Sequence, residues 1–142
     1  MSGNYKFIDH TADIACEVSG DTIEELYTVS AEAWRSSVVE ETKYSKRESK
    51  KFELIASSKE QLLVDFLSEL NFYLFTRKWL FNLVKEMKIK NENNTWILNV
   101  KIEGMPLSAE IEIKQEIKAI TFHQMNIEII GNQYSTLIVF DI

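Results

Sequence analysis

The sequence predicts an α+β domain in which two helices pack on a mostly antiparallel β-sheet. Three observations lead to this class: two segments with apolar residues at helical spacing, short strand-like segments around them, and a series of strand-like segments after residue 79. This order of elements is typical of α+β proteins. With 142 residues, 45% of them hydrophobic, the chain is expected to form a single domain, residues 1–142, with a sizeable core.

Short strands are expected in the first half of the chain. Residues 5–8 form a short first segment, and residues 14–18 and 52–56 have the alternation of a strand. The stretch 40–51 is rich in charge, and Tyr44 is its one aromatic residue. A solvated connector or an edge strand is therefore favoured here over a nucleic-acid contact.

Two helices are predicted from their capping residues and apolar stripes. The first spans about residues 22–39, with Thr22 as N-cap and Glu25 reaching back to complete a capping box. The second begins after Ser58, with Gln61 completing the box, and has a broad apolar face. The core is expected to join both helices to the sheet through Trp34, Leu63, Phe66, Leu67, Leu70, Ile120, Leu137 and Val139.

The chain after residue 79 is predicted to be β-structure. Asn91-Glu92-Asn93-Asn94 tolerates turn geometry and is expected to close a hairpin, and Gly131-Asn132 marks a second turn. The last segment, residues 134–140, is almost continuously apolar, which predicts a central strand buried on both faces. Residues 107–114 are ambiguous. Strands are expected at residues 80–89, 95–103, 117–123 and 134–140.

Charge and cysteine content limit the classes of function. A net charge of −6 argues against holding nucleic acid through the overall field, although it leaves room for a local basic patch or a basic protein partner. The single cysteine, Cys16, excludes an internal disulfide, suits a reducing compartment and is expected to be a small buried hydrophobe. Without a signal peptide or a run of 18 apolar residues, the chain is expected to be cytoplasmic and not membrane-bound.

Two polar clusters are candidates for a functional site. The segment Phe7-Ile8-Asp9-His10-Thr11-Ala12-Asp13 offers carboxylates, an imidazole and a hydroxyl, either as metal ligands or as an acid/base pair. The alternative is a turn in which Asp9 or Thr11 bonds to nearby backbone amides. At the other end, Asp141 adjoins the terminal carboxylate of Ile142. A cation between them would reduce their repulsion, whereas water would hydrate a plain strand end.

Four segments, in the same order along the chain, resemble the signatures of the archease family. The resemblance covers essentially the whole chain. Its departures are mild: Phe122 stands where tyrosine is common in that family, Phe66 stands where tryptophan is common, and residues 104–115 fit the pattern poorly. The four segments are Phe7–Asp13, Leu62–Leu70, Glu116–His123 and Val139–Ile142.

The resemblance implies an accessory protein and not an enzyme with catalytic residues of its own. Archeases activate an RtcB-type RNA-splicing ligase by promoting its guanylylation and turnover, so that ligase is the expected partner and RNA is involved through it. The divalent-metal site of the family would correspond to Asp13, Asp141 and a backbone or carboxylate oxygen of Ile142. The functional surface around this site is expected to comprise Asp9, His10, Lys118 and His123.

The expected ligands indicate the kind of metal. An all-oxygen set favours a hard cation, so Ca²⁺ is the expected ion, with Mg²⁺ or Mn²⁺ as alternatives. If His10 or His123 entered the ligand set, zinc or manganese would be favoured.

Two rival functions stay open. One is a metal-dependent hydrolase or nuclease that uses Asp13, Asp141 and His123. The other is a generic chaperone or adaptor with a structural metal. The sequence offers no phosphate-binding glycine loop and no nucleophile motif, which favours an accessory protein over an enzyme.

Overall fold

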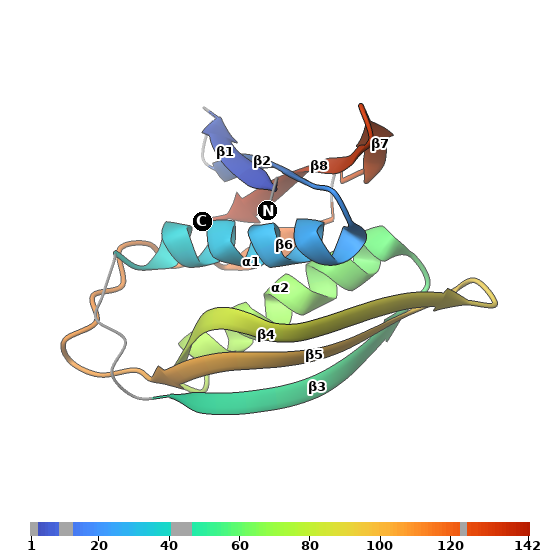
Figure 1. Ribbon diagram of the computed structural model, residues 1–142. Coiled ribbons are helices and arrows are strands. Elements are labelled where there is room, and N and C mark those ends of the chain that lie inside the picture. Colours follow the sequence, from blue (N-terminus) through green and yellow to red (C-terminus); the bar gives the residue numbers. More distant parts are fainter. Residues whose placement is uncertain (1–2, 9–12, 41–46, 123–124) are drawn as a thin grey trace.

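The computed structural model describes residues 3–8, 13–40, 47–122 and 125–142 (Figure 1). Asp9, His10 and His123 of the predicted functional surface lie outside these described residues. The elements are β1 (Asn4–Ile8), β2 (Asp13–Gly20), α1 (Ile23–Val38), β3 (Glu48–Ala56), α2 (Lys59–Phe75), β4 (Trp79–Glu92), β5 (Thr95–Pro106), β6 (Ala119–Thr121), β7 (Glu128–Ile130) and β8 (Gln133–Asp141).

The two helices form a layer between two antiparallel sheets (Figure 1). One sheet has the order β1-β2-β8-β6, with β7 also pairing with β8, and the other has the order β3-β5-β4. Helix α1 contacts β2 on one side and β4 on the other, while α2 contacts β3, β4 and β6. The predicted α+β class is confirmed, but the expectation of one sheet is wrong. The apolar surface of the helices is too broad for one sheet to cover, so burying it requires a sheet on each side.

The start of α1 follows the predicted capping box with one difference. Thr22 Oγ1 accepts a hydrogen bond of 3.0 Å from the backbone amide of Glu25. The Glu25 side chain reaches back beyond the cap and accepts a bond of 2.9 Å from the amide of Asp21. The helix therefore begins where the sequence predicts, because its first backbone amides have side-chain acceptors.

The start of α2 confirms the N-cap of the predicted capping box but not the bond back from Gln61. Ser58 Oγ accepts a hydrogen bond of 3.0 Å from the backbone amide of Gln61, as an N-cap does. The Gln61 side chain does not reach back to Ser58; its Nε2 donates to Asp65 Oδ1 at 2.8 Å. Asp65 is one turn further along α2, so the amide finds a charged acceptor on its own helix.

Two turns with positive φ connect neighbouring strands of the sheets. Asn93 and Asn94, with φ of 51° and 62°, join β4 to β5 and confirm the predicted hairpin. Gly131 and Asn132, with φ of 56° and 70°, join β7 to β8. The turn at residues 131–132 was expected, but β7 was not, because its residues are exposed and have no apolar alternation.

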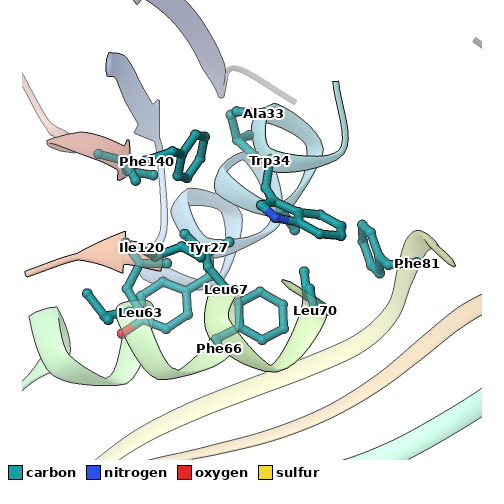
Figure 2. Close-up of a cluster of buried hydrophobic side chains, with 14 of the residues drawn as sticks. Tyr27, Ala33, Trp34, Leu63, Phe66, Leu67, Leu70, Phe81, Ile120 and Phe140 are labelled. Atoms are coloured by element: carbon teal, nitrogen blue, oxygen red, sulfur yellow. The ribbon is translucent and has the colours of Figure 1, made fainter. Parts of the chain in front are cut away.

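The core lies between the sheets and around both helices. Tyr27 of α1 stacks with Phe66 of α2 at a ring-centroid distance of 6.2 Å (Figure 2). The prediction that Leu137 is largely buried is wrong, because it lies on the face of β8 that points away from the helices and is only half-buried. Neither helix of the described chain is long and apolar enough to cross a membrane. The other predicted core residues are buried: Trp34, Leu63, Phe66, Leu67, Leu70, Ile120 and Val139.

Candidate functional site

Asp13 and Asp141 are direct partners in the ladder between β2 and β8. Asp13 is the first residue of β2 and Asp141 is the last residue of β8, so the antiparallel register brings the two ends of the chain together. Directly opposed residues on antiparallel strands place their Cβ atoms about 4.5–5.5 Å apart on the same face. The two side chains therefore begin close enough for one ion to contact both carboxylates; the ion itself stays a prediction.

The backbone of Asp141 is held from its other side by the start of β6. Ala119 is the ladder partner of Asp141 in β6, and the backbone amide of Lys118 donates a hydrogen bond of 2.8 Å to the Asp141 carbonyl. Lys118 is itself exposed. The site therefore joins residues from three strands, β2, β8 and β6, and the exposed Lys118 directly precedes β6 next to the backbone of Asp141.

A side-chain amide of α2 fixes the segment that leads into Lys118. Asn71 Nδ2 donates a hydrogen bond of 2.9 Å to the carbonyl of Ile117, which is buried. Asn71 Oδ1 accepts a hydrogen bond of 3.0 Å from Trp34 Nε1. The amide thus ties together α1, α2 and the residue before Lys118, which explains how a segment without regular structure has a fixed position next to Asp141.

Thr121 adds a polar group that the sequence reasoning missed. It pairs with Val139, two residues before Asp141, so its side chain lies on the same face of the sheet as the two aspartates. Its Oγ1 atom is buried and has no hydrogen-bond partner among the described residues. A buried hydroxyl without a partner is costly in isolation, so a bound ion or its water would satisfy it.

A pocket of about 450 Å³ opens beside Asp13. Phe7 and Ile14 form an apolar part of its wall, and Ser36 and Lys114 form a polar part. The backbone amide of Lys114 donates a hydrogen bond of 2.9 Å to the Val38 carbonyl, which ties this wall to the end of α1. Sequence reasoning did not identify Ser36 or Lys114, because nothing in the local pattern indicates that the residue 114 region returns to α1.

The ligand set of the described residues fits a hard cation only in part. Asp13 and Asp141 would supply carboxylate oxygens and Ile142 a further oxygen, whereas the Thr121 hydroxyl lies opposite Val139, two residues along β8 from Asp141. These are the oxygen ligands that Ca²⁺ and Mg²⁺ prefer. The described residues contain no group of three or more histidine, cysteine, aspartate or glutamate side chains arranged to hold a metal. Asp9, His10 and His123 lie outside the described residues.

Cys16 takes no part in this site. It is fully buried on the side of β2 that faces the helices, and burial raises the pKa of its thiol from a usual value near 9 to about 11. A thiol with a raised pKa is a poor nucleophile and a poor metal ligand at neutral pH. This finding confirms the prediction that Cys16 is a small buried hydrophobe.

Comparison with known proteins shows the family of the chain. Residues 5–142 match the model of the archease protein family (MTH1598/TM1083), and the chain belongs to that family. The protein archease of Archaeoglobus fulgidus is 34% identical over 139 residues, which cover 97% of this chain and 98% of that protein.

Two solved structures have the same fold over nearly the whole chain. The solution structure of Methanobacterium thermoautotrophicum protein 1598 matches with a TM-score of 0.79 and 25% identity, covering 97% of this chain and 98% of that one. An archease of Thermotoga maritima, described as a possible chaperone, matches with a TM-score of 0.64 and 28% identity, covering 96% of each chain. The two-sheet arrangement is therefore the archease fold.

Proposed function

We propose that this protein is a metal-binding accessory protein that activates an RtcB-type RNA ligase by promoting its guanylylation and turnover. The observation that carries the proposal is the pairing of Asp13 with Asp141, which joins the first and last motifs of the chain. Family membership is consistent with an accessory protein, since one archease structure is described as a possible chaperone.

In this proposal the metal is bound by Asp13, Asp141 and an oxygen of Ile142. A divalent cation held there would supply positive charge that offsets the two carboxylates and attracts an oxygen of the partner. The protein's own contribution is position: β6 and β2 hold the backbone of Asp141 from both sides, so its side chain starts from a fixed point. Lys118 would steer a phosphate or an acidic group of the partner.

Overall charge also supports a protein partner that itself holds RNA. A ligase that binds RNA has a basic surface, and this chain has a net charge of −6. Opposite charges on two proteins accelerate their encounter and favour the correct orientation. Contact through the acidic site would therefore depend on salt concentration.

The proposal is tested by adding the purified protein to a purified RtcB-type ligase and measuring guanylylation of the ligase over time. The expected result is faster guanylylation at substoichiometric amounts of this protein, with no effect on RNA or nucleotide when the ligase is left out. RNA cleavage by the protein alone would instead support the metal-dependent hydrolase. Slowed aggregation of the ligase without faster guanylylation would support the chaperone or adaptor with a structural metal.

A further inference from the structure

The three-stranded sheet has one face against the helices and one face outside. Phe52, Met87 and Val100 pack toward the core from β3, β4 and β5. Because side chains alternate along a strand, the neighbours of these residues point to the opposite face. No described helix or strand covers that outer face (Figure 1).

The outer face gathers positive charge in an acidic protein. The surface formed by Lys51, Lys88, Lys90 and Lys101, together with Glu53 and Glu86, is called the outer lysine face. With the neighbouring Asn99 these residues line a groove of about 520 Å³. Four lysines and two glutamates give this face a charge of +2, so the remainder of the chain, whose total is −6, carries −8.

Two of these lysines repel each other. Lys51 of β3 and Lys101 of β5 are direct partners in the ladder, and like charges directly opposite each other are unfavourable in a sheet. Glu86 of β4 lies opposite Lys101 on its other side and offsets part of this repulsion. Lys51, Lys88 and Lys101 form no ion pair within the described part of the chain, whereas Lys90 lies 3.7 Å from Glu92. Close like charges on one sheet face are typical of a binding surface, where a ligand of opposite charge relieves their repulsion.

We propose that the outer lysine face binds the phosphate backbone of single-stranded RNA without reading its sequence. The lysines are spread over all three strands, so they fit the regularly spaced phosphates of a nucleic-acid backbone better than they fit one small anion. The one aromatic ring in the groove lining, that of Phe52, packs inward on the core, so the face offers no stacking platform for bases. Phosphate recognition follows from the lysines alone; the choice of RNA rests on the proposed function.

The test measures binding of a fluorescent single-stranded RNA of about 16 nucleotides, long enough for one groove, by anisotropy over a range of salt concentrations. Single strands lose affinity with a log–log slope of about −0.7 per neutralised phosphate, so four lysines predict a slope of about −2.8. The variant Lys51→Gln/Lys101→Gln is expected to reduce the slope to about −1.4. The matched control Lys6→Gln/Lys78→Gln, which removes two exposed lysines elsewhere, is expected to bind as the unchanged protein does.

Three results would overturn this inference: no salt-dependent binding by the unchanged protein, an equal loss in the control variant, or equal displacement by polyglutamate of the same charge. Guanylylation of the ligase in the absence of RNA separates the two proposals. The variant Lys51→Gln/Lys101→Gln is expected to stimulate guanylylation as the unchanged protein does. A loss of RNA binding in this variant therefore tests the RNA proposal without testing ligase activation.

Discussion

Asp13 and Asp141 face each other across β2 and β8, although they stand at opposite ends of the sequence. The pairing places two like charges directly opposite each other at the end of a sheet, and a cation between them would reduce their repulsion. If the proposed metal binds to both carboxylates, the stability of this end of the fold is expected to depend on that metal.

The first prediction concerns that coupling. In the presence of a chelator, Asp141→Asn is expected to change the free energy of unfolding by less than about 1 kcal/mol, with a tendency to stabilise, because one of two like charges is removed. Added Ca²⁺ is expected to raise the Tm of the unchanged protein and not that of the variant, since only the folded site binds the ion. Thermal melting with and without Ca²⁺ measures this. An equal rise in Tm for both proteins would contradict a shared ion at Asp141.

The second prediction concerns the core. Leu67 is fully buried in α2 between the two sheets, so Leu67→Ala is expected to cost about 2–5 kcal/mol in chemical denaturation. Ile55→Ala is the matched control, because Ile55 is 60% exposed and is expected to change stability by about 0.5 kcal/mol or less. A loss below about 0.5 kcal/mol for Leu67→Ala would refute the assigned packing.

The third prediction concerns Asn71, which positions the segment before Lys118. Asn71→Leu removes the amide that bridges two other groups and is expected to cost about 1–3 kcal/mol, because the Ile117 carbonyl and the Trp34 Nε1 group are left without their bonds. Asn126→Ala on the exposed surface is the control. Amide hydrogen exchange at Lys118, whose amide bonds to Asp141, is expected to accelerate in Asn71→Leu only. Unchanged exchange would show that Asn71 does not position this segment.

The fourth prediction concerns pH and Cys16. The pKa of its thiol is raised by burial to about 11 in the folded protein, above its usual value near 9. Above pH 9 the unfolded chain loses this proton more readily than the folded chain, so stability is retained below pH 9 and falls as pH rises toward 11. The fall is expected to approach about 1.4 kcal/mol per pH unit at most. Denaturation at pH 8 to 10 measures it, and Cys16→Ala is expected to lack this part of the fall; an identical pH dependence would contradict the burial of the thiol.

The elements of the fold were predictable because their signals are local. Thr22 and Ser58 cap helices through a bond to the amide three residues later, and Asn93 and Asn94 take the positive φ that a tight hairpin requires. Tertiary arrangement was not predictable in the same way. The division into two sheets and the half-exposed position of Leu137 depend on which strands pair, and periodicity along one strand does not contain that information.

In the candidate site, too, the residues with a local signal were predictable and the tertiary arrangement was not. The two polar clusters that contain Asp13 and Asp141 were candidates from their residues alone, and resemblance to a family assigned both to one metal site. Their adjacency depends on a register between the first and last long strands of one sheet. Thr121, Ser36 and Lys114 carry no signal of their own in the sequence. They come near the site because β6 pairs with β8 and because Lys114 returns to the end of α1.

The central claim is that the Asp13–Asp141 pair is the part of this protein that activates the ligase. The most direct measurement is the initial rate of ligase guanylylation with Asp13→Asn. The control is Glu17→Gln, which removes a carboxylate from the same face of β2, four residues or about 13 Å further along the strand. Asp13→Asn is expected to fold normally and lose stimulation, whereas Glu17→Gln is expected to retain it. Normal stimulation by a correctly folded Asp13→Asn would contradict the account.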